Sequence, residues 1–167
     1  SVLDYKINRM VFPSSQSVYG TSSSVFNDQP VKEDHYCGLQ HQLFTYAVMK
    51  LLNEFMAQKY ISLHNVSIAC TRPSVVFGYG RKRSSLMWAE EFATNPALGK
   101  KVHLPFPEEN KDNYIYVEDC AEQFIELSLK ETLNHFVYNS GSETVSGIEL
   151  KKIIKDLVPD AEVTFDE

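Results

Sequence analysis

Short apolar runs alternate along the chain with longer segments in which apolar residues recur every three or four positions. This pattern predicts strands over 9–12, 66–70, 102–104, 114–117 and 136–138, and helices over 43–60, 84–94 and 119–131. A polar, serine-rich loop is expected from Gly20 to Leu43, between the first strand and the first helix. Strands that alternate with helices in this way indicate an α/β fold with a mostly parallel sheet.

A last helix near the C-terminal end has the most complete start signal. Ser146 and Glu149 stand three residues apart, as in a capping box, in which each side chain bonds the backbone N–H of the other residue. Pro159 ends the segment. The apolar positions in between follow at i, i+3, i+4 and i+7, and they are Leu150, Ile153, Ile154 and Leu157.

The composition fits one globular domain or a large part of one. Lys and Arg number 16 and Asp and Glu number 22 among 167 residues, a net charge of −6, so no nucleic-acid partner is expected. The chain is 43% hydrophobic, which is enough to bury a core, yet no apolar run approaches the roughly 20 residues of a membrane span. The sparse cysteines Cys37, Cys70 and Cys120 indicate free thiols in a reducing, cytoplasmic compartment.

The candidate chemistry begins with Tyr46 and Lys50. Because the two residues are four apart in a predicted helix, both project from one face, about one turn apart. A lysine ammonium beside a phenol favours the phenolate, so the pair is a usable acid or base for a sugar or alcohol hydroxyl. The spacing alone is a weak signal, since a packed tyrosine and a solvated lysine share it in many helices.

Four other segments surround this pair in a fixed order. A serine-rich segment, 14–20, follows the first strand, and hydroxyls at the C-terminal ends of parallel strands lie where open α/β sheets place their sites. Later segments read Arg-Pro-Ser-Val-Val-Phe-Gly at 72–78, Tyr-Ile-Tyr-Val-Glu-Asp-Cys-Ala at 114–121 and Asn-Ser-Gly-Ser at 139–142.

In this order and spacing, the five segments resemble the extended short-chain dehydrogenase/reductase family, and in particular its NAD-dependent epimerase/dehydratase branch. The resemblance runs from about Val2 to Phe165. It implies a Rossmann-like, doubly wound, mostly parallel sheet with a small C-terminal α/β substrate-binding part. Residues 1–80 would then be the C-terminal half of the NAD(P)-binding domain, and 81–167 mainly the substrate side, partly interleaved with the first part.

The resemblance also implies roles for three catalytic residues. Ser15 falls on the position of the catalytic serine, which holds the reacting oxygen. Tyr46 would take or give the hydroxyl proton. Lys50 would stabilise the Tyr46 phenolate and hydrogen-bond the ribose of the cofactor.

The cofactor and substrate contacts follow from the same resemblance. It places the 72–78 segment against the nicotinamide end of NAD or NADP. Arg81, in a basic turn beyond that segment, is expected to contact a substrate anion, with Ser15 at the reacting oxygen; a solvated basic turn is the alternative. The expected cofactor contacts are Tyr46, Lys50, Pro73, Ser74 and Val76.

Two departures from the family pattern qualify this picture. Gly78-Tyr79-Gly80 is the only G-x-G, it comes late in the chain, and Arg83 takes the third glycine position, so it is not a phosphate loop. We therefore expect the early strands of the fold, with their glycine-rich loop, to be missing from this sequence. Many nucleotide-sugar epimerases of the family have Arg-Asp where Asp112 and Asn113 stand here, which counts against a nucleoside-diphosphate sugar.

These features predict an NAD(P)-dependent oxidoreductase of the epimerase/dehydratase type, which acts on a sugar or nucleotide-sugar hydroxyl or carbonyl by hydride transfer. A non-catalytic NAD(P)-binding regulator or scaffold is the first alternative, although such relatives usually lack the tyrosine or the lysine. A simple carbonyl reductase is the second. The wide apolar arc of helix 43–60 suits burial on more than one side and predicts a homodimer for the intact protein.

No metal site is expected. His35, Cys37 and His41 are metal-ligand residue types, but they lack a clear fourth ligand at zinc spacing. Small-molecule substrate and dinucleotide are therefore the only bound groups that the sequence predicts.

Overall fold

The computed structural model describes residues 3–20, 31–82 and 84–167. Residues 21–30 of the expected loop, and Arg83, lie outside the described residues. By its internal contacts the chain divides into two compact units, one of Ser1–Ser74 with Ala121–Ser140 and one of Val75–Cys120 with Gly141–Glu167. The predicted functional division near residue 80 concerns cofactor and substrate roles and stays a prediction.

The first unit is built on a three-stranded parallel sheet. Its strands are β1 (Met10–Pro13), β2 (Ile68–Arg72) and β6 (Val137–Asn139), in the order β1-β2-β6. Both pairings are parallel. The central strand β2 is buried at every residue, which is typical of parallel strands that are covered on both faces.

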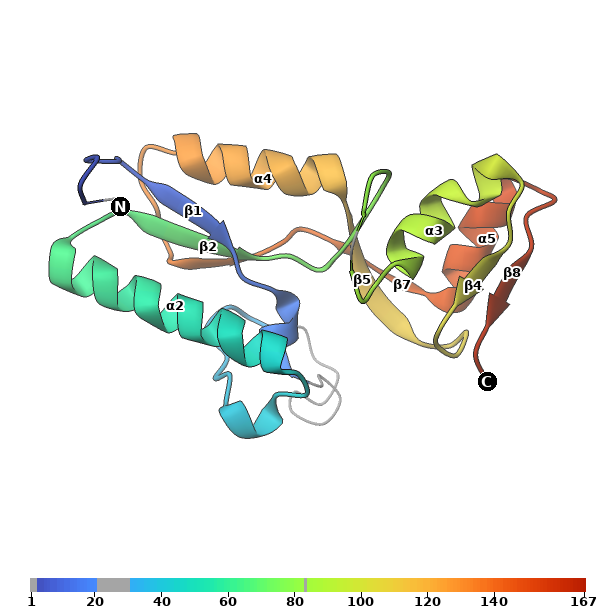
Figure 1. The fold of residues 1–167 in the computed structure, drawn as a ribbon, viewed down its shortest axis with the longest axis horizontal. Coiled ribbons are helices and arrows are strands. Elements are labelled where there is room, and N and C mark those ends of the chain that lie inside the picture. Colours follow the sequence, from blue (N-terminus) through green and yellow to red (C-terminus); the bar gives the residue numbers. More distant parts are fainter. Residues whose placement is uncertain (1–2, 21–30, 83) are drawn as a thin grey trace. The chain divides into compact units, whose positions relative to one another are not determined.

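Helices lie on both faces of this sheet. Figure 1 shows α2 (Thr45–His64) on one side of β1 and β2 and α4 (Val117–Leu129) on the other. Asn65, in the left-handed conformation at φ 51°, ends α2, and its N–H bonds the carbonyl of Ile61. The Arg9 guanidinium donates to the carbonyls of Leu127, at 3.0 Å, and of Lys130, so a cation covers the negative end of α4.

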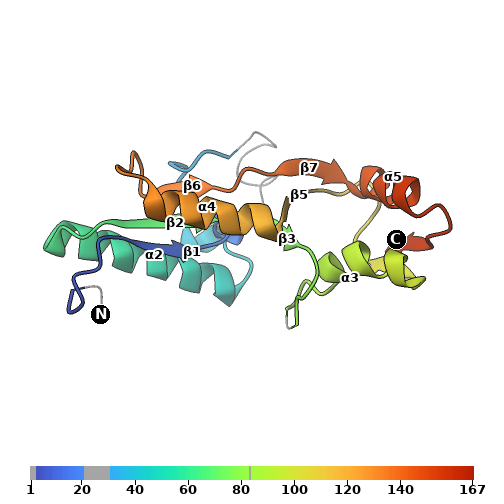
Figure 2. The same cartoon turned by 90° about the horizontal axis from the view of Figure 1, so that it is seen from above.

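The second unit holds a three-stranded sheet, a two-stranded sheet and the helices α3 (Trp88–Thr94) and α5 (Gly147–Leu157). Strands β3 (Val75–Phe77), β5 (Lys111–Tyr116) and β7 (Glu143–Ser146) lie in the order β3-β5-β7, the first pairing parallel and the second antiparallel. Strands β4 (Val102–Leu104) and β8 (Val163–Phe165) form a parallel pair. Figure 2 shows β7 beside β5 and leading into α5.

Aromatic rings fill the core of the second unit. Trp88 packs edge-on against Phe106, with ring centroids 5.1 Å apart, and Phe92 packs edge-on against Tyr114 at 5.8 Å. Each such pair contributes about 0.5–1.5 kcal/mol beyond the area it buries. Buried aliphatic residues complete this core, and they are Val75, Ala89, Val102, Leu104, Leu150, Ile154, Ala161 and Val163.

Most predicted elements are confirmed within two to four residues. The capping box is present, because the Ser146 hydroxyl accepts from the Glu149 N–H at 3.2 Å and the Glu149 carboxylate accepts from the Ser146 N–H at 2.8 Å. The predicted helix 84–94 begins only at Trp88, since the Ser84 hydroxyl bonds the Leu86 N–H and holds a local turn. Strands β3 and β7 were not predicted. Among the described helices, none has the length and hydropathy to cross a lipid bilayer.

Candidate active site

Ser15 lies where β1 ends and a short 3₁₀ helix, η1 (Gln16–Tyr19), begins. Its hydroxyl oxygen accepts hydrogen bonds from the Ser17 N–H at 3.2 Å and from the Ser17 hydroxyl at 2.9 Å. The Ser14 N–H donates to the Thr71 carbonyl at 2.7 Å, which ties this segment to the end of β2. Ser15 is therefore held at the C-terminal edge of the parallel sheet, as predicted for a site in an open α/β fold.

Tyr46 and Lys50 lie in the first two turns of α2 and meet the same edge. The Lys50 Nζ is 5.3 Å from the centroid of the Tyr46 ring. It also donates to the carbonyl of Pro13 at 2.7 Å, two residues before Ser15. Tyr46 is 55% exposed, so a ligand can reach its ring. The structure thus brings the three predicted catalytic residues onto two adjoining segments, the end of β1 and the start of α2.

A buried ion pair lies one turn further along α2, and the sequence analysis did not identify it. The Glu54 carboxylate accepts from Arg72, with Oε1 3.0 Å from Nε and Oε2 2.7 Å from Nη2. The two side chains are only 6% and 5% exposed. The Ser14 hydroxyl donates to the same carboxylate. The available signal was the four-residue spacing that Glu54 shares with Tyr46 and Lys50.

Arg72 is held from its other side as well. Its Nη1 donates to the Tyr19 hydroxyl at 2.7 Å and to the Glu33 carbonyl at 3.2 Å, and its guanidinium lies 4.7 Å from the Tyr19 ring centroid. Burial opposes the charge of Arg72, but the hydrogen bonds and charge of Glu54 outweigh burial and raise its pKa. Burial also raises the pKa of Tyr19, so its neutral phenol accepts from Arg72 and donates to Asn139 Oδ1 at 2.7 Å.

Pro73 and Ser74 follow β2 in the first unit. The Ser74 N–H donates to the Ser140 hydroxyl at 2.9 Å. The Ser74 hydroxyl itself is buried and has no hydrogen-bond partner among the described residues. An unpaired buried hydroxyl is costly unless another group bonds it.

The other two predicted contacts belong to the second unit. Val76 lies in β3, paired with Ile115 of β5. The Arg81 Nη1 donates to the Leu86 carbonyl at 2.8 Å, so part of its guanidinium holds the loop before α3. Ser15, Tyr46, Lys50, Pro73 and Ser74 therefore share the first unit, and Val76 and Arg81 the second.

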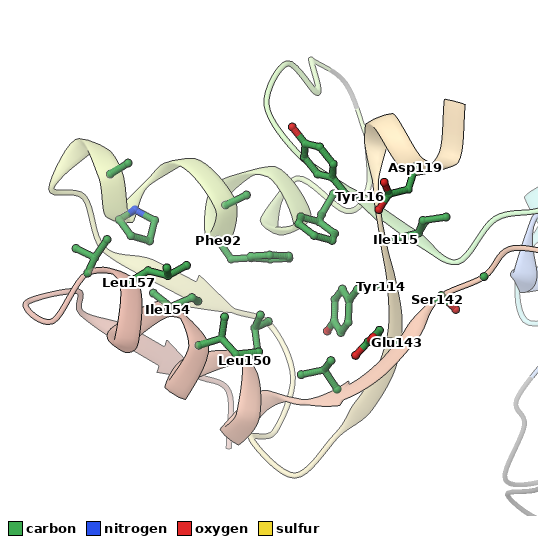
Figure 3. A pocket seen from close by; sticks show the side chains of 18 residues that line it. Phe92, Tyr114, Ile115, Tyr116, Asp119, Ser142, Glu143, Leu150, Ile154 and Leu157 are labelled. Atoms are coloured by element: carbon green, nitrogen blue, oxygen red, sulfur yellow. The ribbon is translucent and has the colours of Figure 1, made fainter. Parts of the chain in front are cut away.

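A cavity of about 850 Å³ lies within the second unit, and the sequence analysis did not predict it. Figure 3 shows its walls, with Phe92 of α3, Tyr114 of β5 and Leu150 and Ile154 of α5 around it. The Tyr114 hydroxyl is buried and unpaired among the described residues. Burial, and then the charge of Asp112, raise the pKa of Tyr114 and keep its phenol neutral.

His35 and Cys37, which are metal-ligand residue types, form hydrogen bonds with neighbouring residues of the chain. The Lys32 N–H donates to His35 Nδ1 at 2.8 Å, and the Cys37 thiol donates to the His35 carbonyl at 3.5 Å. In the part of the chain that the structure describes, no three His, Cys, Asp or Glu side chains converge as a metal site would require. The three cysteines are free thiols.

A parallel sheet covered on both faces, with polar side chains at its C-terminal edge, defines a Rossmann-like α/β protein. The family model described as "NAD dependent epimerase/dehydratase family" matches residues 1–141. The chain belongs to this family, which confirms the resemblance seen in the sequence. No curated protein matches the chain significantly.

Solved structures share the fold along nearly the whole chain. The UDP-N-acetylglucosamine 4-epimerase of Methanobrevibacter ruminantium M1, in complex with UDP-N-acetylmuramic acid, is 20% identical with a TM-score of 0.82, over 99% of this chain and 52% of that one. The UDP-glucuronic acid 4-epimerase of Bacillus cereus, in complex with UDP-glucuronic acid and NAD, is 22% identical with a TM-score of 0.73, over 95% and 48%.

A third neighbour has a different reaction. The GalE-like L-threonine dehydrogenase of Cupriavidus necator is 16% identical with a TM-score of 0.83, over 99% of this chain and 53% of that one. At these identities the likeness establishes the Rossmann-like fold. The chain spans about half the length of these structures.

Proposed function

We propose that the protein is an NAD(P)-dependent oxidoreductase of the epimerase/dehydratase type, in which Ser15, Tyr46 and Lys50 carry the acid–base chemistry. The observation that supports this most directly is the position of Lys50. Its ammonium lies 5.3 Å from the Tyr46 ring and is fixed by the Pro13 carbonyl, next to the segment of Ser15. A non-catalytic regulator or scaffold would not need a lysine held beside a tyrosine in this way. The arrangement therefore favours the catalytic reading.

The residues of the first unit fit a dinucleotide. The Lys50 ammonium has three N–H donors, and one of them bonds the Pro13 carbonyl. We propose that another bonds a hydroxyl of the ribose. We propose the Ser74 hydroxyl, which is unpaired among the described residues, as another polar contact beside Pro73. Val76, which belongs to the second unit, stays a proposed cofactor contact from the sequence. A bound nicotinamide supplies a hydride donor or acceptor, which protein side chains cannot.

The chain's own residues move and hold a proton. Tyr46 exchanges a proton with the substrate hydroxyl, and the Lys50 ammonium lies 5.3 Å from the centroid of its ring. The Ser15 oxygen accepts both of its bonds from Ser17, which leaves its own proton to donate to the reacting oxygen. Ser15 thereby orients the substrate oxygen while Tyr46 carries out the transfer.

The proposed substrate is a sugar or nucleotide sugar with a reacting hydroxyl or carbonyl. Two of the structural neighbours are UDP-sugar epimerases, which supports this class. Here Asn113 bonds Thr144 across the β5–β7 pair, and the Asp112 carboxylate accepts the Asn113 N–H. Neither residue is basic, so we propose Arg81 for any contact with a substrate anion.

The replacement Tyr46→Phe tests the proposal in the intact protein. It removes only the phenol oxygen, so turnover falls by roughly 10²–10⁴-fold while cofactor affinity stays within a few-fold. Lys50→Ala lowers both, because Lys50 is proposed to contact both Tyr46 and the ribose. Tyr60→Phe, on the same helix and also exposed, is the matched control and keeps full activity. A Tyr46→Phe protein with more than about half the activity contradicts the assignment.

Exchange of the bound cofactor with free cofactor in solution distinguishes a reductase from an epimerase. A reductase releases its reduced product and must bind fresh cofactor at each turnover, whereas an epimerase returns the hydride to the same substrate. Labelled NADH added during turnover therefore transfers its label to the product of a reductase and not to that of an epimerase.

A further inference from the structure

We propose that Glu54, Arg72 and Ser14 are positioning residues that set where Ser15 lies relative to Tyr46 and Lys50. This inference rests on the proposed function. None of the three is proposed to touch the substrate, and each acts through the residues that it holds in place.

The first line of evidence is the face of α2. Tyr46, Lys50 and Glu54 recur every four residues, so they lie one above another on successive turns. Two of them reach the end of β1, where Lys50 bonds the Pro13 carbonyl and Glu54 accepts from the Ser14 hydroxyl. Consecutive turns of the helix are thus joined to the two residues that directly precede Ser15.

The second line of evidence is the orientation of the Glu54 carboxylate. Arg72 donates to both of its oxygens, at 3.0 Å and 2.7 Å, and such a bidentate contact with a planar guanidinium restricts the rotation of the carboxylate. Tyr19 and the Glu33 carbonyl hold Arg72 in turn. Because the carboxylate cannot rotate freely, the Ser14 hydroxyl that donates to it is also held in place.

The third line of evidence is where the network ends. Arg72 is the last residue of β2 and directly precedes Pro73 and Ser74. The Tyr19 hydroxyl extends the network to Asn139, the last residue of β6. The same buried bonds therefore join the C-terminal ends of all three strands of the first sheet, where the proposed catalytic and cofactor contacts lie.

A purely structural ion pair would not explain this geometry. The cost of removing two charges from water offsets much of their attraction, and apolar side chains of similar size often replace a buried pair without loss of stability. Directed hydrogen bonds supply orientation, which apolar contacts do not. Orientation matters here, because a displacement of about 1 Å at a catalytic group can reduce the rate by roughly 100-fold.

Two variants of the intact protein test the inference. Ser14→Ala removes the hydroxyl that joins Glu54 to the segment of Ser15 and leaves the ion pair whole. Glu54→Leu combined with Arg72→Met replaces the pair by apolar side chains. Each is expected to lower kcat, per folded molecule, by roughly 10- to 100-fold, with both KM values within about threefold. Lys152→Ala breaks an exposed pair, Lys152–Asp156 at 3.8 Å, and is the control with unchanged kcat.

The kcat of the folded variants decides between a positioning role and a purely structural role. If both variants keep kcat within about twofold while Tyr46→Phe abolishes turnover, the network is only structural, and the positioning role is wrong while the proposed function stands. If Tyr46→Phe keeps its activity, the proposed function fails and this inference fails with it. If the double variant does not fold, Ser14→Ala decides alone, since it removes a single atom from a network that stays paired.

Discussion

Breaking the Glu54–Arg72 ion pair from one side is expected to lower the stability of the protein strongly. In Glu54→Leu, the Arg72 guanidinium stays 95% buried and loses its bonds at 3.0 Å and 2.7 Å. Among the described residues, the Tyr19 hydroxyl and the Glu33 carbonyl remain as its partners. The change therefore leaves a buried charge without its counter-charge.

The magnitude follows from the bonds that are lost. Hydrogen bonds to charged groups contribute about 1.5–3 kcal/mol each, so two of them give about 3–6 kcal/mol. Loss of one partner of a buried ion pair typically costs about 3–5 kcal/mol, which agrees. At about 2–4 °C per kcal/mol for a chain of this size, the melting temperature falls by roughly 6–20 °C. Arg72→Met has a similar effect, because it removes the counter-charge of the Glu54 carboxylate and leaves the bond from the Ser14 hydroxyl in place.

A double-mutant cycle measures the interaction. The free energy of unfolding is obtained from urea titrations of the parent, both single variants and Glu54→Leu combined with Arg72→Met, followed by circular dichroism. The double variant should be more stable than either single variant, because neither charge is then left unpaired. Asp156→Ala, in an exposed ion pair, is the control and should change stability by no more than about 1 kcal/mol. The reasoning is refuted if Glu54→Leu costs less than about 1 kcal/mol, or if the two single effects simply add in the double variant.

The remaining predictions concern a cap, a thiol and a surface. Ser146→Ala removes the oxygen that accepts the Glu149 N–H and should cost about 1 kcal/mol in thermal unfolding, whereas no change would contradict the capping role. Burial raises the pKa of Cys70 to about 12 from an ordinary value near 9, so the folded state keeps a proton that the unfolded state releases. Stability is then complete below pH 9 and declines towards pH 12, and urea titrations should show a smaller decline for Cys70→Ala; an equal decline would exclude this thiol as a cause. The exposed apolar side chains of α2, among them Met49 at 60% and Leu52 at 57%, predict a homodimer for the intact protein, which light scattering should detect; a monomer mass at micromolar concentration would overturn it.

Local patterns predicted the elements whose signal lies within a few residues. The apolar repeat located α2, and the Ser146–Glu149 pair located the start of α5. Strand β7 has no such signal. Its residues Glu143-Thr-Val-Ser include one apolar side chain, and the strand exists because it pairs with Lys111–Tyr114, about thirty positions earlier. The cavity of the second unit likewise depends on contacts between segments far apart in the sequence, namely α3, β5 and α5.

The same limit applies to the candidate site. Ser15, Tyr46 and Lys50 were found because their segments carry recognisable spacing. Glu54 stands among the apolar residues of α2, where a charged side chain is normally solvated. Its burial depends on Arg72, eighteen positions away on β2, and helical periodicity contains no information about a partner on another element.

The strand order of the first sheet has a consequence for synthesis on the ribosome. Strand β2 lies between β1 and β6, with Cys70 beside Val137, so its second neighbour is translated only after the 75–120 segment of the other unit has been translated. Until then one edge of the most buried strand in the sheet has open backbone donors and acceptors, a state prone to pairing with other chains. The vulnerable period of folding is therefore set by translation speed through residues that do not belong to the first unit.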